Sequence, residues 1–250
     1  MKVPKIVLES VSGSIAEDWH QHPNGGGWVY KTAYVEESAY LHPTSIVSGN
    51  AQVSGYARVS GDAWVYGNAQ VSGNAQVSGN ALVSGNAQVY GNARVSGDAQ
   101  VYGNAQVSGN AQVYGNAQVS GNAQVSGDAQ VSGNAQVYGN APVYGNAQVY
   151  GNAQVYGNAQ VSGDAQVSGD ARVYGNAWTI SPLYIQGSRH AVTLSSYSAI
   201  TIGCLTRTIE EWQQEYRKIG VANGYSEAAI EEYAEYIELA ARTAARLKQA

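Results

Sequence analysis

The chain has 250 residues, of which only 12% are charged, and its formal net charge at pH 7 is −5. It contains 30 glycines and 19 tyrosines but no phenylalanine, a bias that indicates an internal repeat. The mild negative charge argues against binding of nucleic acid through a broad basic surface. The single cysteine, Cys204, allows no intrachain disulfide and fits a reducing compartment. No apolar stretch is long enough for a transmembrane helix, so we expect a cytoplasmic protein that does not associate with membranes.

Residues 1–28 precede the repeat. We expect them to form a cap over its open end, with a strand over residues 2–9, because an uncovered end exposes unpaired backbone. His20 and His22 have the spacing of half a metal site, but no third ligand follows at a suitable distance in the sequence. We therefore predict a surface loop there and no metal.

From Val29 onward the chain repeats six residues, Ala-Gln-Val-Ser/Tyr-Gly-Asn/Asp. An aliphatic residue recurs at every sixth position from Val29 to Val173, and Thr179 and Ile185 keep the frame. Alternate side chains of a strand share one face, so Ala and Val point inward and Gln points outward. Gly and Asn then turn the chain because they tolerate left-handed backbone angles. Three such units close a triangular coil of 18 residues.

The constant frame argues against the two alternatives. A helix is disfavoured because Gly at every sixth residue costs about 1 kcal/mol relative to Ala, and the valines lie on no single helical stripe. Disorder fits the Gly, Ser, Asn and Gln content, but a solvated linker has no need of a constant phase. We therefore predict about nine coils over residues 29–190, stacked at roughly 4.8 Å into a prism on the order of 43 Å long.

The frame Val-x-Gly-Asn-Ala-x resembles the hexapeptide-repeat, left-handed β-helix proteins, and this resemblance implies that the coils are left-handed. The start of the repeat, Gly25-Gly26-Gly27-Trp28-Val29, looks like that of uncharacterised acetyltransferase-like proteins of bacteria and prophages. Many hexapeptide-repeat proteins are trimeric acyltransferases that use acyl-CoA and a catalytic histidine near a loop that leaves the coils. Here no insertion interrupts the repeat, and only His42 and His190 lie near it, at its two ends. We therefore predict no catalytic residue and no cofactor, and keep an acyl-CoA-dependent acyltransferase as an alternative.

The surface of the coils is predicted to carry ladders of outward Gln and corner Asn, which stabilise stacked strands through side-chain amide bonds. The residue after each Val is usually Ser or Tyr, and residues 18 apart share a corner of the triangle. One corner holds a column of tyrosines, which suits packing between subunits because Tyr adds apolar area and a polar tip. Unequal duplication of repeat blocks would also produce this column. The candidate contact residues are Tyr66, Tyr102, Tyr138, Tyr156 and Tyr174.

Residues 191–250 are expected to form a short β segment and then a helical hairpin. The capping box Thr208-Ile209-Glu210-Glu211 opens the first helix, and Asn223-Gly224 ends it. Ser226 is expected to cap a second helix over residues 227–247. The stretch 200–212 resembles a module that recurs behind repeat arrays in uncharacterised phage and bacterial proteins.

The tail also contains the candidate ligand site. A helix N-terminus favours an anion through its free N–H groups and its dipole, and Thr206-Arg207-Thr208 lies at one. Arg189 and His190 are expected one strand away, with Tyr197 and Trp212 as a stacking surface. This set suits a phosphate-bearing molecule such as a nucleotide. In the alternative interpretation Thr208 is only a cap, Trp212 is core and the arginines are solvated.

The leading interpretation is therefore a non-catalytic, rigid repeat scaffold that is associated with a phage or prophage. We expect its tail to form a homo-oligomer, a trimer by analogy with the family, and to bind or sequester a small nucleotide-like ligand. If a phage encodes the protein, its location is the cytoplasm of the host cell. Besides the acyltransferase, the second alternative is a purely structural spacer or fibre protein.

Overall fold

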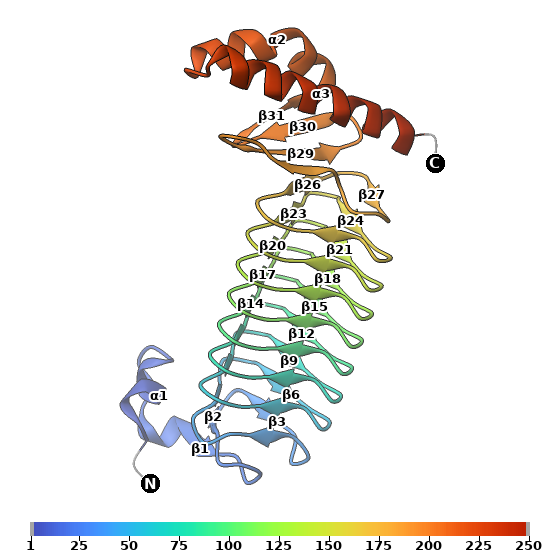
Figure 1. Ribbon diagram of the computed structural model, residues 1–250. Coiled ribbons are helices and arrows are strands. Elements are labelled where there is room, and N and C mark those ends of the chain that lie inside the picture. The colour runs from blue at the N-terminus through green and yellow to red at the C-terminus, as the bar shows by residue number, and fades with distance from the viewer. Residues whose placement is uncertain (1–2, 249–250) are drawn as a thin grey trace.

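The computed structural model describes residues 3–248, which form a rod of stacked triangular coils (Figure 1). A short helix lies beside one end of the rod, and a small module of strands and helices covers the other. The predicted fold class is confirmed, because a parallel β-solenoid is followed by a short β segment and a C-terminal helical hairpin. The left-handed sense of the coils stays a prediction from the resemblance.

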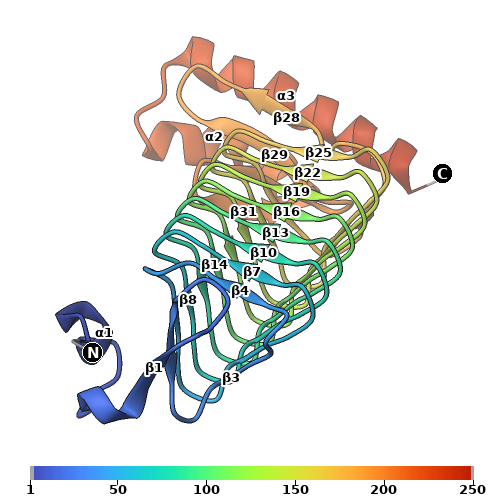
Figure 2. The ribbon, with the colours of Figure 1, turned by 90° about the horizontal axis from the view of Figure 1, so that it is seen from below.

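The coils consist of strands of two or three residues that stack in three parallel sheets, so that the rod is triangular in cross-section (Figure 2). The first sheet runs from β2 to β26, the second from β3 to β27 and the third from β4 to β25. In the described residues the third sheet has 8 strands, so the rod makes eight complete turns and part of a ninth. The coil strands are β2 (Trp28–Tyr30), β3 (Tyr34–Val35), β4 (Tyr40–Leu41), β5 (Ile46–Val47), β6 (Gln52–Val53), β7 (Arg58–Val59), β8 (Trp64–Val65), β9 (Gln70–Val71), β10 (Gln76–Val77), β11 (Leu82–Val83), β12 (Gln88–Val89), β13 (Arg94–Val95), β14 (Gln100–Val101), β15 (Gln106–Val107), β16 (Gln112–Val113), β17 (Gln118–Val119), β18 (Gln124–Val125), β19 (Gln130–Val131), β20 (Gln136–Val137), β21 (Pro142–Val143), β22 (Gln148–Val149), β23 (Gln154–Tyr156), β24 (Gln160–Val161), β25 (Gln166–Val167), β26 (Arg172–Tyr174) and β27 (Ala177–Trp178).

The interior of the rod is filled by the Val and Ala of each repeat, which are fully buried from Val47 to Val173 and from Ala51 to Ala171. Burial of one Val contributes very roughly 1.5 kcal/mol, so a single unit is unstable and only the stack holds. The corner glycines from Gly49 to Gly175 have φ between +58° and +75°. A Cβ at Gly109 would also lie 3.0 Å from the backbone of Gly127 in the next coil. At the corners from Gly49 to Gly151, glycine is therefore favoured both for its φ and for the close stacking of coils.

Asn side chains form ladders along the corners. The longest is unbroken from Asn50 to Asn158, and in it each Nδ2 donates to the Oδ1 that lies 18 residues later. The other two corners contain aspartates such as Asp128, whose carboxylate accepts from Asn110 but has no hydrogen to donate onward. Among the described residues the outward glutamines make one such bond, between Gln154 and Gln136 at 3.5 Å. Asn rather than Gln therefore forms the side-chain ladders.

The N-terminal segment contains α1 (Lys5–Glu9), a 3₁₀ turn (Ala16–Asp18) and β1 (Trp19–Gln21), which pairs antiparallel with β2. The strand predicted over residues 2–9 is therefore wrong for its described part. Val3 and Val7 are four residues apart, and a helix lets both pack against an apolar cluster of the first sheet and β1. The described residues contain no group of three or more side chains that could hold a metal.

The C-terminal module has a four-stranded antiparallel sheet in the order β28-β29-β30-β31, packed against the helices α2 and α3. Val192 and Ile202 lie on the face of this sheet that packs against the helices, whereas the opposite face is polar and includes the buried Thr193 and Thr201. None of the described helices is both long and apolar enough to span a membrane. The elements are β28 (Tyr184–Gln186), β29 (Ala191–Ser196), β30 (Ala199–Ile202), β31 (Leu205–Thr208), α2 (Ile209–Ala222) and α3 (Glu227–Leu247).

The stack of coils ends before the predicted boundary at residue 190. In β27 the register slips by one residue, so that Trp178 rather than Thr179 pairs with Val161 and points inward. A slip by one residue exchanges the two faces of a strand, which is why Thr179 is exposed. Ile185 keeps the sixfold frame but lies in β28, where it pairs with Val192.

Candidate functional site

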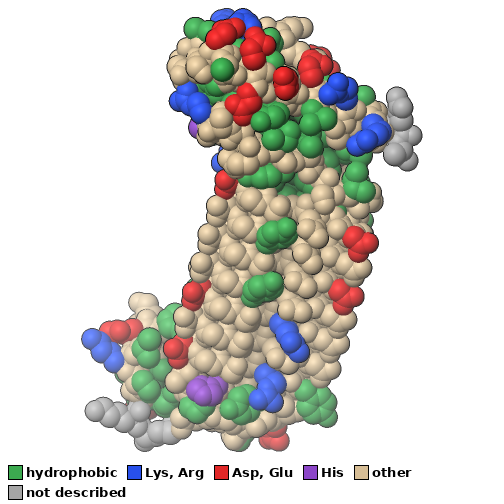
Figure 3. All heavy atoms as spheres, in the orientation of Figure 1, with side chains coloured by type: hydrophobic (Ala, Val, Ile, Leu, Met, Phe, Trp, Pro, Cys, Tyr) green, Lys and Arg blue, Asp and Glu red, His purple; other side chains and the backbone are tan. Residues whose placement is uncertain are grey.

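The walls of the rod offer few places for a ligand. Between residues 28 and 178, all of which the structure describes, three-residue corners follow one another with no inserted loop. Charged side chains gather on the C-terminal module, whereas the visible face of the rod carries few (Figure 3). A hollow of about 510 Å³ between α1 and the first sheet is mostly apolar and contains Asp62, whereas the hollows lined by Arg and His are at the C-terminal end.

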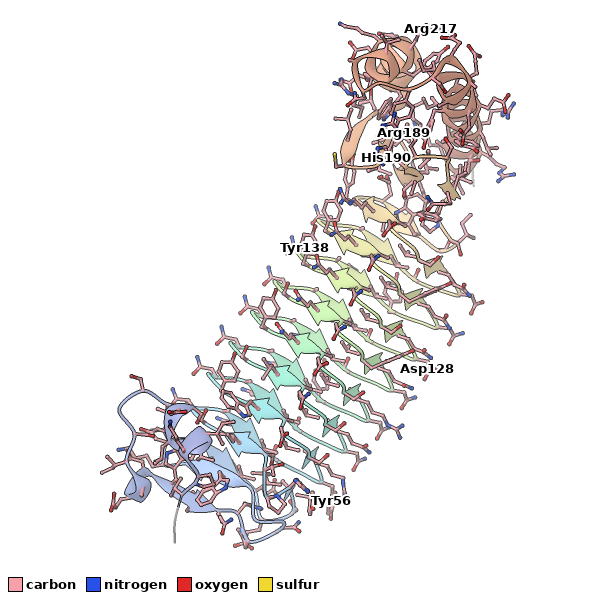
Figure 4. All side chains as sticks on the ribbon, turned by 60° about the vertical axis from the view of Figure 1, so that its left-hand side comes forward. Tyr56, Asp128, Tyr138, Arg189, His190 and Arg217 are labelled. Carbon is pink, nitrogen blue, oxygen red and sulfur yellow. The ribbon has the colours of Figure 1, made fainter. Side chains whose placement is uncertain are left out.

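Two hollows meet at the loop that precedes β29. The first, which we call the aromatic cavity, has a volume of about 170 Å³ and lies between the sheet and the two helices. The second, which we call the junction cleft, has a volume of about 440 Å³ and lies between the last coils and the sheet. Both are lined by Arg189, His190 and Cys204. Figure 4 labels Arg189 and His190 at this junction.

The aromatic cavity is walled by side chains from β30, β31, both helices and the linker between the helices, among them Trp212, Tyr216, Tyr225 and Tyr233. The indole Nε1 of Trp212 donates to the carbonyl of Ile200 at 2.9 Å, which fixes the ring. The rings of Tyr225 and Tyr233 pack edge to face with centroids 5.3 Å apart. The cavity thus offers a rigid aromatic surface to a flat ligand group.

The loop that carries Arg189 and His190 is clamped to α3. The hydroxyl of Tyr233 accepts the backbone N–H of Arg189 at 3.1 Å and of His190 at 2.6 Å, and donates to the carbonyl of His190 at 2.8 Å. Glu232 accepts the backbone N–H of Ser188 at 2.8 Å. Hydrogen bonds from Ser188 and Tyr236 hold the pKa of Glu232 below its ordinary value of 4.5. Two adjacent residues of one helix therefore fix the backbone of the loop that carries both basic side chains.

The guanidinium of Arg189 has partners within the protein for only some of its N–H groups. It lies 4.3 Å from the ring centroid of Tyr225, and its Nη1 donates to the carbonyl of Gly224 at 2.9 Å. The described residues provide no hydrogen-bond partner for its Nε and Nη2 groups, which remain able to meet an acceptor in the cavity or the cleft. The ring of His190 lies over Gly203, where a Cβ would be 3.1 Å from His190 Cγ. Gly203 thus gives the imidazole its space.

The junction cleft is polar. The last coils contribute Gln154, Asp170 and Arg172, and the sheet contributes Thr193 and Thr201. Arg172 replaces the Gln that most coils carry at the outward position, and it adds a second guanidinium to a cleft that already contains Arg189. With His190 beside them and Asp170 as the carboxylate, the lining favours an anion.

The coils themselves match a family model that is described as the YdcK beta solenoid repeat. Overlapping copies cover residues 51–163, and a further copy covers residues 165–179, which together are just over half of the chain. The chain belongs to the YdcK beta-solenoid repeat family. A search of curated proteins found no match. The YdcK repeats end before the loop at Arg189, so the family model describes the rod and not the C-terminal module.

Beyond the YdcK repeats, the structure brings three of the seven predicted ligand residues to one cavity, namely Arg189, His190 and Trp212. Tyr197 lies elsewhere, against Trp178 with ring centroids 5.2 Å apart. The other three predicted residues occupy β31 and the start of α2. The role of all seven in ligand binding stays a prediction.

The start of α2 already has its own anionic partners. Thr208 Oγ1 accepts the N–H of Glu211 at 3.1 Å, and the Glu211 carboxylate accepts the N–H of Thr208 at 2.9 Å. Thr206 bonds to Thr201 at 2.7 Å, and Arg207 pairs with Glu215 at 3.1 Å. This geometry follows the alternative that the sequence left open, with Thr208 as a cap.

The structure adds residues that sequence reasoning did not include in the site. Tyr225, Tyr233 and Arg172 line the hollows, and Cys204 lies at their common wall. The sequence did contain a sign of Arg172, because Arg stands there in the last coil at a position where most coils have Gln. No sequence feature pointed to the role of Tyr233, because helical spacing indicates that the residue is buried but not which backbone groups its hydroxyl contacts.

The tyrosine column divides into two parts. Tyr138 and Tyr156 stack with centroids 5.2 Å apart and planes at 7°, and Tyr174 continues the stack at 5.6 Å. Burial raises the pKa of Tyr156, and the neighbouring Tyr138 and Tyr174 raise it further. Tyr66 and Tyr102, which have Ser in the coils on either side, do not belong to this stack.

The two histidines near the YdcK coils lie at opposite ends of the rod. His42 is partly exposed, and its Nδ1 is 3.0 Å from Thr44 Oγ1. In the described residues no hydrogen bond joins the His190 ring to a carboxylate that would orient it as a base. No observation thus favours the acyltransferase alternative.

Proposed function

We propose that this YdcK-repeat protein is a rigid, non-catalytic scaffold whose C-terminal end binds a small phosphate-bearing, nucleotide-like ligand. The observation that supports this proposal is the meeting of an aromatic cavity and a basic cleft at Arg189 and His190. A base stacks on aromatic side chains, and a phosphate pairs with guanidinium groups. The two hollows provide these two kinds of surface side by side.

The rod supports the scaffold part of the proposal. Each coil contacts only its neighbours, and every contact repeats at 18 residues, so the stack has no hinge built into its corners. The rod holds the C-terminal module at a fixed distance from α1. A purely structural spacer is the second candidate, and the uniformity of the coils favours it.

Self-association and biological setting also belong to the proposal. The exposed Val221 and Leu239 on α2 and α3 give the helical hairpin apolar surface for a homo-oligomer, with a trimer as the expected state. The resemblance of residues 200–212 to phage modules supports a phage or prophage protein that acts in the cytoplasm of the host. Sequestration of a nucleotide signal is the role that this setting suggests.

Titration of the full chain with ADP, monitored by calorimetry, tests the ligand site. Arg172→Gln restores the residue of the repeat and should weaken ADP binding about tenfold, because a guanidinium–phosphate bond is worth roughly 1.5–3 kcal/mol. Arg94→Gln is the matched control, since Arg94 is exposed on the third sheet far along the chain from the cleft. Equal binding by both variants would refute the site.

Inorganic phosphate and acetyl-CoA complete the set of probes. Binding of acetyl-CoA with no turnover fits the scaffold, whereas acyl transfer from acetyl-CoA would favour the acyltransferase alternative over the scaffold. If neither ADP nor acetyl-CoA nor phosphate binds, the spacer becomes the better account. Analytical ultracentrifugation of the same protein measures the oligomeric state independently of the ligand.

A further inference from the structure

One edge of the rod differs from the other two. At the corner between the first and the second sheet, Tyr and Ser alternate from Tyr66 through Ser84, Tyr102 and Ser120 to Tyr138. We call this row the Tyr edge. Its tyrosines are 36 residues apart, which is two coils or about 9.6 Å along the rod. Figure 4 shows Tyr138 on this edge and Asp128 on another.

The alternation controls how the rings lie. Tyr66 is 37% exposed and Tyr102 is 38% exposed, whereas Ser84 between them is only 8% exposed. The covered Ser84 between the partly exposed Tyr66 and Tyr102 indicates that a tyrosine ring of a neighbouring coil leans over it, whereas Ser120 is partly exposed. Where Tyr156 and Tyr174 follow Tyr138 without a Ser, the rings stack on one another instead.

The Tyr edge is also the one long edge whose corner amides include no carboxylate. Its ladder from Asn50 to Asn158 consists of Asn alone, whereas the other two edges carry Asp62, Asp98, Asp128, Asp164 and Asp170. Each Asn uses one N–H of its amide for the ladder, so the second N–H is left for another acceptor. The rings are therefore flanked by neutral hydrogen-bonding groups.

We propose that the Tyr edge binds a neutral, extended β-1,4-linked polysaccharide that lies along the rod. The C–H faces of pyranose rings pack on aromatic rings, and their hydroxyls bond to amides. In an extended β-1,4 chain every second sugar presents the same face, and this two-sugar repeat is close to the two-coil spacing of the tyrosines. Tyr66 and Tyr102 form two stacking platforms in register with such a chain, whereas Tyr138 already stacks on Tyr156.

The other classes of partner fit this edge less well. A single-stranded nucleic acid needs a positively charged groove beside the stacking rings, and the edge from Ser48 to Asn158 carries no Lys or Arg. A stable subunit interface buries about 800 Å² on each partner, whereas this edge is one row of rings on a convex corner. A narrow, neutral row suits a linear polymer.

Binding of the full chain to insoluble cellulose and to cellohexaose tests the proposal. The variant Tyr66→Ser/Tyr102→Ser uses the residue already present in alternate coils and should bind at least about tenfold more weakly, since 1.4 kcal/mol corresponds to tenfold. The control is Tyr90→Ser/Tyr144→Ser on the next edge, where two rings of similar exposure lie three coils apart. It should bind like the unmodified protein.

Two results would overturn the proposal. The first is that the unmodified protein does not bind cellulose or cellohexaose, and the second is that both double variants lose glycan binding equally. A change in sedimentation of Tyr66→Ser/Tyr102→Ser with unchanged glycan binding would instead assign the edge to subunit packing. Circular dichroism of each variant establishes that the coils remain folded. The outcome is independent of the ADP titration, because the junction cleft lies at the end of the rod.

Discussion

Replacement of a corner glycine by alanine separates two reasons for its presence. Gly109 has φ of +67°, and a Cβ there would lie 3.0 Å from the N and O atoms of Gly127. Gly157 has nearly the same φ, +65°, but the nearest atom to its Cβ would be Tyr174 Cβ at 3.9 Å. Gly109→Ala therefore combines backbone strain with a clash between coils, and Gly157→Ala has the strain alone.

The structure gives the expected magnitudes. A left-handed conformation costs an alanine about 1–2 kcal/mol, which is the expected loss for Gly157→Ala. Overpacking against backbone that cannot move aside adds about 1–3 kcal/mol, so Gly109→Ala should lose about 2–5 kcal/mol. Because each coil contacts only its neighbours, the excess loss should be confined to the coils around residues 109 and 127.

Urea unfolding followed by circular dichroism measures the total loss, and hydrogen exchange read by mass spectrometry locates it. Gly109→Ala should speed exchange in the flanking coils well beyond Gly157→Ala at its own site. Equal losses in the two variants would refute the reasoning, since strain alone would then explain the glycines.

Three further predictions concern the clamp and the ladders. Tyr233→Phe removes the acceptor of two backbone N–H groups and should destabilise the C-terminal module by about 1–3 kcal/mol in urea unfolding; an unchanged midpoint would contradict this. Because the pKa of Glu232 is lowered on folding, its contribution is present above pH 4.5 and is lost as pH falls below that value, so Glu232→Gln should flatten the acid dependence of thermal unfolding, and parallel pH profiles would speak against it. Asp128→Asn supplies the missing donor to Asn146 and should be more stable than Asp128→Ala by about 0.5–1.5 kcal/mol in urea, whereas equal stabilities would show that the ladder contributes nothing.

The coils could be predicted from the sequence because each residue meets the same neighbours 18 positions away. The end of the stack was harder to place. The aliphatic frame continues through Thr179 and Ile185, but the corner after Thr179 has Ser181 and Pro182 in place of the Gly that recurs from Gly49 to Gly175. The first coil turns at Lys31, Glu37 and Pro43 without such a Gly, so neither the aliphatic frame nor the corner Gly alone marks the end of the stack.

The site could be predicted only in part. Arg189, His190 and Trp212 share a cavity as the order of elements indicated, whereas Thr208 was a cap whose own carboxylate partner lies three residues later. The hydroxyl of Tyr233 holds a loop that is 43 residues away in the sequence. Helical periodicity predicts that such a residue is buried, but the partner of a buried hydroxyl depends on the tertiary fold.

The cross-section of the rod has a consequence for its length. α1 packs on the first sheet near Trp28 and Ile46, and the junction cleft opens beside Gln154 and Arg172 of the same sheet. Gain or loss of 18 residues would move the two ends by about 4.8 Å along the axis and keep them on one side. Gain or loss of a single six-residue unit would instead turn the C-terminal module by a third of a turn away from α1. The rod can therefore lengthen by whole coils of 18 residues while α1 and the junction cleft stay on the same side of it.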